Sequence, residues 1–330
     1  MGAIDWSDAR RVIEGNRSFL VTSHQNPEGD AIGSEIALVR HLRERGKSVR
    51  IVNPSPTPEN CRFLDPEGEI ILFDPDRAGA VLQGVDAILI VDLSSWAQLG
   101  SFAEVLKSAP QIRVCIDHHL EPDADIAEVA VIDTRAAAAG VLVYELIRDM
   151  GGPISLPTAE ALYAAILVDT GSFRFSNTDA RALRAGADLV ALGVRPERIY
   201  RDAFENRSFA SVRLLALALE TLGRKAGGRI VWAHVTRPML SKAQANLEDA
   251  DGFIEVLRAI RGVEVCALFK EQAPDSIRVS LRSQGQVNVQ RFARALGGGG
   301  HAKAAGLTYS GSMEEAVRAV VAGLEALVSG

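Results

Sequence analysis

The first half of the chain alternates short apolar runs with longer segments in which apolar residues recur at helical spacing. The run Ala87–Leu93 (AILIVDL) is apolar on both faces, which is typical of a parallel strand covered by helices on both sides. Apolar residues recur with a helical period over Ala31–Arg45 and over Ala137–Met150, which Gly151 and Gly152 then end. This alternation predicts an α/β fold with a mostly parallel sheet and helices on both faces.

The same pattern separates the chain into two parts. In the first part, the predicted strands are Ser18–Ser23, Val49–Asn53, Ile70–Phe73, Ala87–Leu93 and Arg113–Ile116. From Asp179 to about Gly223 the spacing is helical throughout, and strands and helices then return in a second, smaller α/β domain. We therefore predict a first domain over residues 1–204, a helical linker over 205–222 and a second domain over 223–330.

Length and composition fit two globular domains in a reducing compartment. The chain has 330 residues, 47% hydrophobic and 24% charged, so it is long enough for two cores and too apolar for disorder. No apolar run approaches the ~20 residues of a membrane span, and the N-terminus lacks an export signal. Three widely spaced cysteines show no metal-binding spacing. We expect a cytoplasmic protein, and its net charge of −6 argues against one that coats long nucleic acid.

The first candidate site is the segment His24–Asp30 (HQNPEGD), which follows a predicted strand and precedes a helix. One histidine and the two carboxylates of Glu28 and Asp30 fall within seven residues. Ligands in open α/β sheets bind outside the carboxyl ends of strands, so this is a suitable position for a binding loop. The structural alternative is a turn with Asp30 capping the helix, which explains neither the histidine nor Glu28.

Further chemical groups stand at the ends of three other elements. Asp92 ends the buried strand, Asp117-His118-His119 end the strand RVCIDHH, and Asp169 follows a helix, where the dipole favours a cation. Each alone could be a strand end at the surface or a turn residue. Together with the first segment they indicate a metal site, and a mixture of imidazole and carboxylate suits Mn²⁺ or Co²⁺ better than Mg²⁺.

The second domain carries the positive charge of the chain. Residues 258–303 hold eight lysines and arginines against three acids, although the whole chain is acidic. Arg282 lies in the strand segment SLRS, and Gly297–Gly300 precede His301 and a run of small residues. Glycines allow backbone N–H groups to approach an anion closely. A flexible loop and a solvated basic face are the structural alternatives, and we predict an anion-binding domain.

These motifs resemble those of the DHH phosphoesterase family. HQNPEGDAIGS, VDLSS, IDHH and LVDTGSFRFS follow the order of its four motifs, and SLRS and GGGGHAKAAG resemble the domain associated with it. The similarity covers nearly the whole chain and is greatest to the two-domain nanoRNase group. It implies a metal-dependent exoribonuclease or phosphodiesterase. Its substrates would be oligonucleotides of two to five nucleotides, which it would hydrolyse to mononucleotides, and 3′-phosphoadenosine 5′-phosphate would be a further substrate. A cyclic-di-AMP or linear dinucleotide phosphodiesterase is an alternative that the resemblance leaves open.

The resemblance also implies a site that holds two divalent metal ions. One ion would be bound by His24, Glu28 and Asp92, and the other by Asp30, Asp92, His118 and Asp169, with Asp92 shared. Mn²⁺ is expected first, with Co²⁺ or Mg²⁺ as alternatives. The four carboxylates in this set carry four negative charges, which two divalent ions would neutralise.

For the remaining residues the resemblance implies catalytic and substrate-binding parts. Asp117 would orient a histidine and His119 would face the scissile phosphate. The substrate-binding residues would be Arg282, Ser283, Gly298, Gly299, Gly300 and His301. The expected partners are therefore short RNA or DNA oligonucleotides or small nucleotides, without a membrane, and a homodimer is left open.

The chain departs from the family pattern at three positions. Glu28 stands where an aspartate is usual, Gln98 where an arginine is common, and Asp123 where an asparagine is often found. These departures bear on metal choice and specificity more than on hydrolysis. A long-strand exonuclease of the RecJ type, a manganese pyrophosphatase and a non-catalytic nucleotide sensor are competing interpretations. The chain has no room for an extra nucleic-acid-binding domain, and its Gly-rich histidine motif is foreign to the pyrophosphatases.

Overall fold

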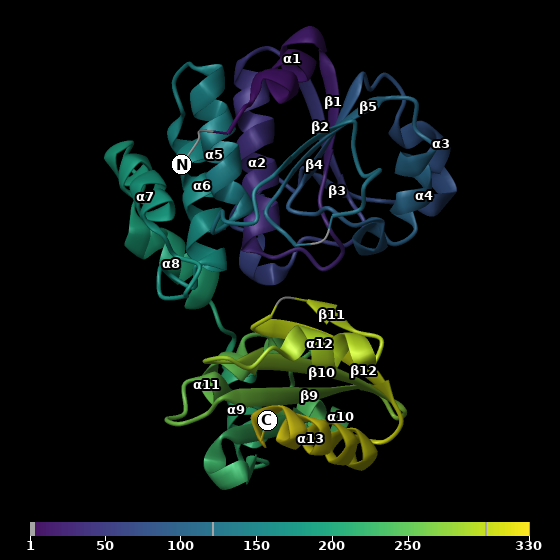
Figure 1. The fold of residues 1–330 in the computed structure, drawn as a ribbon, viewed down its shortest axis with the longest axis vertical. Coiled ribbons are helices and arrows are strands. Elements are labelled where there is room, and N and C mark those ends of the chain that lie inside the picture. The colour runs from purple at the N-terminus through teal and green to yellow at the C-terminus, as the bar shows by residue number, and fades with distance from the viewer. Residues whose placement is uncertain (1–3, 121, 301, 330) are drawn as a thin grey trace. The chain divides into compact units, whose positions relative to one another are not determined.

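The chain forms two compact units, Met1–Asn206 and Arg207–Gly330. A computed structural model describes residues 4–120, 122–300 and 302–329. Each unit has its own six-stranded sheet and its own hydrophobic core (Figure 1). The prediction of an α/β fold with a smaller second α/β part is confirmed.

The sheet of the first unit is parallel throughout, in the order β3-β2-β1-β4-β5-β6. Its strands are β1 (Ser18–Thr22), β2 (Ser48–Asn53), β3 (Ile70–Leu72), β4 (Ala87–Val91), β5 (Ile112–Asp117) and β6 (Val129–Ile132). Every residue of β4 is buried, as its apolar sequence requires for a central strand with helices on both sides. The strand β6 did not stand out in the sequence, because it is short and lies at the edge of the sheet, where Ala130 is exposed and its other three residues are partly buried.

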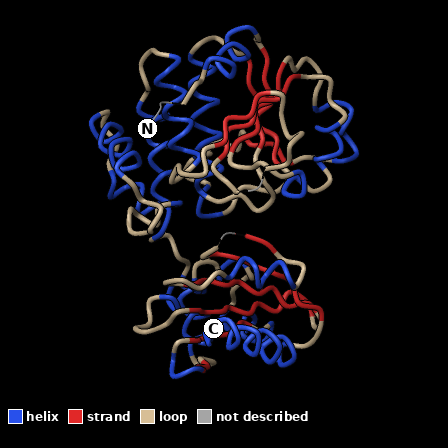
Figure 2. Tube along the Cα trace, viewed as in Figure 1, coloured by secondary structure: helices blue, strands red, loops and turns tan. Residues whose placement is uncertain are grey.

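Helices cover both faces of this sheet (Figure 2). One face packs against α1 (Ser7–Gly15), α2 (Gly29–Glu44) and α5 (Ala139–Met150), and α6 (Leu156–Asp169) packs on α2 and α5. The other face packs against α3 (Ala78–Val81) and α4 (Phe102–Lys107). Outside α6 lie α7 (Ala180–Ala191) and α8 (Pro196–Phe204).

The second unit has a mixed sheet in the order β11-β12-β10-β9-β8-β7, in which only the pair β8–β9 is parallel among the described strands. Its strands are β7 (Gly223–Lys225), β8 (Ile230–Val235), β9 (Val265–Ala273), β10 (Ser276–Ser283), β11 (Gly299–Gly300) and β12 (Ala304–Ser310). One face packs against α9 (Phe209–Leu219), α10 (Arg237–Ala243) and α11 (Phe253–Arg258), and the other against α12 (Val289–Ala295) and α13 (Met313–Ser329).

The segment predicted as a helical linker, 205–222, contains α9. This helix packs against β8 and α10, and its residues Leu214 and Ala218 are buried in the core of the second unit. The sequence shows helical spacing there, but it does not show which core the apolar face of α9 joins.

Close contact between α2 and α6 positions the chemistry of the first unit. A Cβ atom on Gly33 would lie 2.5 Å from Ala161 O, and one on Gly29 would lie 2.6 Å from Val168 Cγ2. The helices can approach this closely only because glycines and alanines line the contact. The N-terminal end of α2 therefore meets the C-terminal end of α6.

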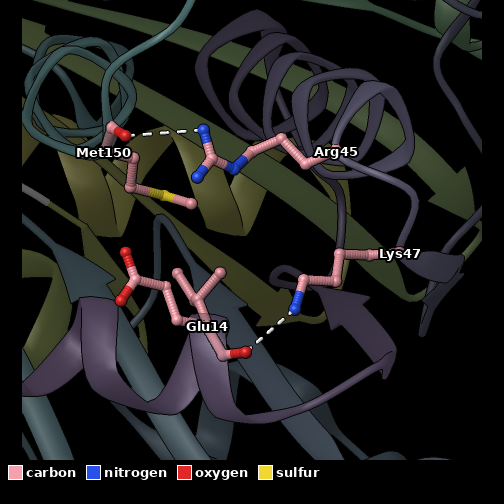
Figure 3. Close-up of a pocket in the computed structure, with 5 residues that line it drawn as sticks. Glu14, Arg45, Lys47 and Met150 are labelled. Carbon is pink, nitrogen blue, oxygen red and sulfur yellow. Dashed lines mark hydrogen bonds between the residues drawn. The ribbon is translucent and has the colours of Figure 1, made fainter.

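An open pocket lies at the opposite end of α2, which with 16 residues is about 24 Å long. Arg45 donates to Met150 O at 3.4 Å and Lys47 donates to Glu14 O at 3.1 Å (Figure 3). Both cations thus bond to carbonyls at the C-terminal ends of helices, where positive charge is favoured. This pocket is a helix-capping arrangement remote from the candidate site.

The described residues include no helix that is long and apolar enough to span a membrane.

Replacing Gly33 with alanine is expected to lower the free energy of unfolding by ~1–3 kcal/mol, because the added methyl group overpacks the contact between α2 and α6. The matched control is Gly79→Ala in α3, where a Cβ atom meets nothing within 4 Å. There alanine is expected to be neutral or to stabilise by ~0.5–1 kcal/mol. Urea unfolding of both variants measures the difference, and equal effects would contradict the close approach.

Candidate metal centre

The candidate site lies where the strand order of the first sheet changes direction. β1 and β4 are neighbours, and the order runs outward from β1 to β3 on one side and from β4 to β6 on the other. Ligands of open α/β sheets bind outside the carboxyl ends of strands at such a point. His24 follows β1, Asp92 follows β4, and His118 and His119 follow β5, so the fold brings them to one edge of the sheet.

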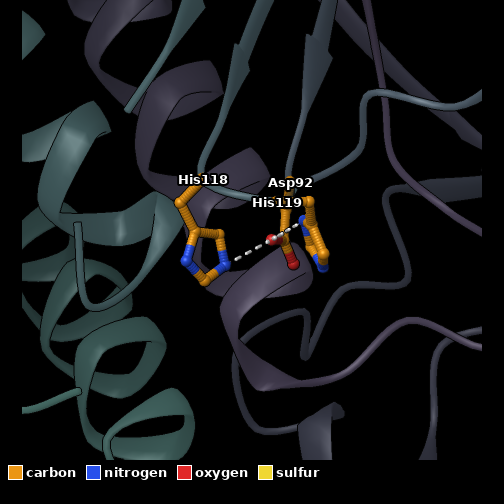
Figure 4. Close-up of side chains that lie close together, drawn as sticks. All are labelled: Asp92, His118 and His119. Carbon is orange, nitrogen blue, oxygen red and sulfur yellow. Dashed lines mark ion pairs between the residues drawn. The ribbon is translucent and has the colours of Figure 1, made fainter. Parts of the chain in front are cut away.

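Asp92 is at the centre of this group. It is buried, and its φ of +59° is a left-handed conformation that is uncommon for residues other than glycine and is often found at functional sites. Its Oδ2 lies 3.5 Å from His24 Nε2. Its Oδ1 lies 3.4 Å from His118 Nε2 and 3.8 Å from His119 Nδ1 (Figure 4). The two oxygens therefore face different histidines, which is the arrangement a shared carboxylate ligand needs.

A second group of ligand atoms surrounds His118. Its Nε2 lies 3.7 Å from Asp30 Oδ2 and 3.8 Å from Asp169 Oδ2. Asp30 stands in the first turn of α2 and Asp169 ends α6, so the packing of these helices brings the two carboxylates together. Asp30 does not cap α2, because Glu28 occupies the N-cap position. Instead its carboxylate accepts hydrogen bonds from the first two backbone N–H groups of α5, at 2.7 and 2.8 Å.

The backbone fixes which nitrogen of each imidazole faces the carboxylates. His24 Nδ1 donates to Gln25 O at 2.8 Å, and His118 Nδ1 donates to Ala136 O at 3.1 Å. Nδ1 must carry the hydrogen to make these bonds, so in the neutral ring the lone pair is on Nε2. In both residues Nε2 is the atom directed at the carboxylates, as in a histidine that ligates a metal.

The electrostatics of the site are those of acids crowded together. Burial, and then the charges of Asp92 and Asp169, raise the pKa of Asp30 well above its ordinary value. Burial also raises the pKa of Asp169 to about 6, against the opposing charge of His118. The pKa of Asp92 is held well below its usual value, because the surrounding imidazoles outweigh its burial. Buried like charges at this separation call for a cation.

Residues in the described part of the chain fit a divalent metal ion. Ligand atoms of Asp92, His118 and His119 lie within 4.8 Å of one another, and so do those of Asp30, His118 and Asp169. The buried Oδ1 of Asp92 accepts no hydrogen bond from any described residue. Mixed imidazole and carboxylate donors suit a borderline divalent ion, so these groups could hold a metal.

Comparison with known proteins agrees with this geometry. The model of the DHH family N-terminal domain matches residues 18–166, and that of the DHHA1 domain matches residues 231–330. A Thermus thermophilus protein named bifunctional oligoribonuclease and PAP phosphatase NrnA is 32% identical over 92% of this chain and 87% of its own. The chain belongs to the DHH family.

Further relatives are similar to this chain over nearly its full length. A Bacillus subtilis protein with the same name is 26% identical over 96% of this chain and 96% of its own. The crystal structure of an exopolyphosphatase-related protein from Bacteroides fragilis superposes with a TM-score of 0.93. It is 26% identical and covers 98% of this chain and 97% of its own. The similarity to the DHH family therefore extends across both units.

The remaining sequence-predicted residues of the DHH unit take different places. Asp117 is fully buried at the end of β5 and accepts a hydrogen bond from His119 Nδ1 at 2.7 Å, so it does orient that ring. Burial alone would lower the pKa of His119, but the hydrogen bond to Asp117 and the charge of Asp92 raise it. Glu28 is exposed and stands outside both of the groups named above, which comprise described residues only.

In the DHHA1 unit the structure separates Arg282 from Ser283. Arg282 is half-buried, and its Nε donates to Glu255 Oε1 at 3.1 Å. Ser283 belongs to the buried face of β10, where its hydroxyl donates to Val287 O at 2.8 Å. Successive residues of a strand point to opposite faces, so the two side chains cannot meet one ligand from the same side.

The glycines of the DHHA1 unit also differ from one another. A Cβ atom on Gly298 would lie 2.2 Å from Gly306 O, and one on Gly300 would lie 2.4 Å from Ala304 O. Close approach of β11 to β12 thus requires glycine at these two positions. A Cβ atom on Gly299 would meet nothing within 4 Å, so that position has open space beside it. His301 lies outside the described residues.

Gln98 and Asp123, two of the departures from the family pattern, form hydrogen bonds that support neighbouring loops. Gln98 accepts a hydrogen bond at Oε1 from Ser95 N at 3.3 Å, and its backbone carbonyl accepts one from Gln25 N at 2.7 Å. Asp123 accepts hydrogen bonds from Ser95 Oγ at 3.1 Å and Trp96 N at 2.7 Å. The backbone carbonyl of Gln98 thus joins the loops that follow β1 and β4, and the side chain of Asp123 joins the loops that follow β4 and β5.

Neither the segment Ala136–Gly140 nor Asn177 was predicted from the sequence to be part of the site. The first contacts the ligands through backbone atoms, which leave no pattern in side-chain chemistry. Asn177 Nδ2 donates to Asp169 O at 3.0 Å and to Ala137 O at 2.9 Å. Its position eight residues after Asp169 was the one available signal.

Metal binding is expected to strengthen as the pH rises towards 9. Burial would lower the pKa of His24, but the hydrogen bond and charge of Asp92 outweigh it and raise the pKa to about 9. A metal must displace this proton, so the apparent affinity for Mn²⁺ should rise by about tenfold per pH unit for each proton released. Calorimetric titration in buffers of different ionisation enthalpy measures both the affinity and the proton release.

The stability of the metal-free protein should show the opposite trend. The raised pKa of His24 stabilises the fold fully below its ordinary value of 6.5, and this contribution is lost as the pH rises through about 9. The variant His24→Gln should release fewer protons on binding Mn²⁺. An affinity that stays flat between pH 7 and 9 in the unsubstituted protein would contradict the assignment.

Proposed function

We propose that this protein is a metal-dependent phosphoesterase that hydrolyses short oligonucleotides, from dinucleotides to pentanucleotides, to mononucleotides. The observation that carries the proposal is the position of Asp92, whose two oxygens face separate histidines at the switch point of a DHH sheet. The relatives named for oligoribonuclease and PAP phosphatase activity support the substrate class. By this analogy 3′-phosphoadenosine 5′-phosphate is a further substrate.

The proposed site holds two divalent ions, with Mn²⁺ as the expected metal. His24, Glu28 and Asp92 would hold one ion, and Asp30, Asp92, His118 and Asp169 would hold the other. When bound, the ions supply positive charge for the phosphodiester oxygens and lower the pKa of an attacking water. Glu28 joins this set by its place in the motif, and its side chain is exposed at the N-cap position of α2.

His119 and Asp117 would handle a proton at the scissile phosphate. The hydrogen bond from His119 Nδ1 to Asp117 fixes the orientation of the ring and its tautomer. Proton exchange with the substrate would then take place at Nε2. The hydrogen bond to Asp117 and the charge of Asp92 raise the pKa of His119 against the effect of burial, which favours the protonated form that a proton donor to the leaving oxygen needs.

In the DHHA1 unit, Arg282 and the glycine turn would bind the phosphate or nucleotide that does not react. Arg278, Ser280 and Arg282 alternate with buried residues of β10 and so share one face of the sheet. The guanidinium of Arg282 offers the planar fork that suits a phosphate. Its present partner is Glu255, so substrate binding would replace one anion by another. Gly299, with open space around it, and His301 complete the proposed set.

A panel of assays tests this function. Purified protein loaded with Mn²⁺, Co²⁺ or Mg²⁺ would be offered oligonucleotides from two to ten nucleotides, cyclic-di-AMP and 3′-phosphoadenosine 5′-phosphate. We expect rates that fall steeply beyond five nucleotides and that depend on the added metal. Turnover of cyclic-di-AMP alone would favour the signalling phosphodiesterase instead. Binding of nucleotides without turnover under any metal would mean that the protein is a sensor.

Arg282→Ala is expected to raise KM for a dinucleotide about 10- to 150-fold, because a hydrogen bond to a charged group contributes ~1.5–3 kcal/mol. Affinity for Mn²⁺ should not change. Hydrolysis of a small activated phosphoester, which lacks a second phosphate, should fall much less. Arg318→Ala is the matched control, because Arg318 is an exposed residue of α13 on the other face of the sheet.

Equal losses on the dinucleotide and on the small ester would contradict this division. Arg282 would then serve the reacting phosphate, and the two units would not have separate parts in the chemistry.

A further inference from the structure

We propose that Arg181 is a positioning residue of the metal centre. Its guanidinium binds Asp133 at the start of the loop 133–140 and Glu145 on the helix that follows, and the backbone of this loop orients Asp30, His118 and Asp169. The inference rests on the proposed function, because these three residues are ligands only if the site binds metal.

The loop contacts two of the ligands directly through its backbone. Ala136 O accepts the hydrogen bond from His118 Nδ1 at 3.1 Å, which turns Nε2 towards the carboxylates. The N–H groups of Ala139 and Gly140 donate to Asp30 at 2.7 and 2.8 Å, one to each oxygen. The directions of this imidazole and this carboxylate therefore follow the position of the loop.

The third ligand is tied to the same loop by Asn177. Its Nδ2 donates to Ala137 O at 2.9 Å and to Asp169 O at 3.0 Å, and it lies 3.5 Å from Asp169 Oδ2. One short segment thus connects all three residues of the group around His118. A shift of the loop would move the three ligands relative to Asp92, which belongs to a different strand end.

Arg181, on α7, binds the first residue of this loop and a residue of the helix α5 that follows it. Its Nη1 donates to Asp133 Oδ2 at 2.8 Å, at the point where the chain leaves β6. Its Nε and Nη2 donate to the two oxygens of Glu145, which lies on α5 beyond Gly140. A single rigid guanidinium therefore sets the separation between the start of the loop and the helix that follows it.

This cluster differs from the exposed ion pairs on the surface of the unit. The side chain of Arg181 is 20% exposed, and those of Asp133 and Glu145 are 9% and 28% exposed. Exposed pairs contribute little because water screens them, whereas a bidentate arginine pair in a partly buried site fixes geometry. Among the described residues, the Arg181 side chain bonds to Asp133 and Glu145 and to none of the three ligands, so its effect on them passes through the loop.

The test counts the metal ions bound by Arg181→Met. The metal-free protein and the variant would be titrated with Mn²⁺, with free Mn²⁺ followed by electron paramagnetic resonance, and each metal-free form would be unfolded in urea. We expect the variant to keep one tight ion and to bind the second about 10- to 100-fold more weakly, as on loss of outer-shell support. On a dinucleotide, kcat should fall with little change in KM at subsaturating Mn²⁺, and excess Mn²⁺ should restore part of it.

Two further variants make the result specific to the loop. Arg181→Lys retains the positive charge but cannot bind both carboxylates, so its affinity for the second ion should lie between those of the unsubstituted protein and Arg181→Met. The same variant tests the inference if Arg181→Met does not fold. Arg198→Met is the matched control, because Arg198 pairs with Glu160 at 3.5 Å on the neighbouring α8 and its side chain is 54% exposed. It should bind both ions like the unsubstituted protein.

Unchanged affinity for both ions in the Arg181 variants would overturn the inference, even if their stability in urea falls, because the residue would then be structural only. Failure of the proposed function itself would be seen in the unsubstituted protein. That protein would then bind fewer than two Mn²⁺ ions or hydrolyse no phosphoester.

Discussion

The site depends on one electrostatic constraint, which is that three aspartates and three histidines share a small, largely buried space at the edge of a parallel sheet. Without a cation, burial and the neighbouring carboxylates raise the pKa values of Asp30 and Asp169, whereas the surrounding histidines lower that of Asp92. Such an arrangement is costly for a fold that gains nothing from it. A divalent ion bound among these side chains would offset the cost, which is why we propose a metal site where the strand and helix ends meet.

The scaffold meets this constraint with small residues and backbone groups. Glycines and alanines let α2 and α6 approach until Asp30 and Asp169 are neighbours. The carboxylate of Asp30 then accepts hydrogen bonds from the N-terminal end of α5, where the helix dipole favours negative charge. Loops and helix ends thus determine how the candidate ligands are oriented, whereas the strand order determines approximately where they lie.

The two units divide the chemistry by charge. The first unit gathers carboxylates and imidazoles, which suit a metal, whereas the second presents basic residues and a glycine turn, which suit an anion. Arg282 pairs with Glu255 and Ser283 supports its own loop, so β10 offers one arginine face and not a pair of adjacent ligands. Under the proposed function, this separation would allow metal affinity and substrate affinity to be measured as independent properties.

The sequence by itself determined the strands of the first sheet except β6, the main helices, the parallel sheet and the family, because apolar periodicity and motif order are local properties of the chain. It also placed His24, Asp92, His118 and Asp169 at element ends, which strand order then brought together. Only the tertiary structure decided that α9 joins the second core, that Asp30 caps α5 and not its own helix, and that Ser283 turns away from Arg282. It alone connected Arg181 to the loop 133–140. These features depend on backbone hydrogen bonds and on packing between distant segments, and neither leaves a periodic or compositional mark in the sequence.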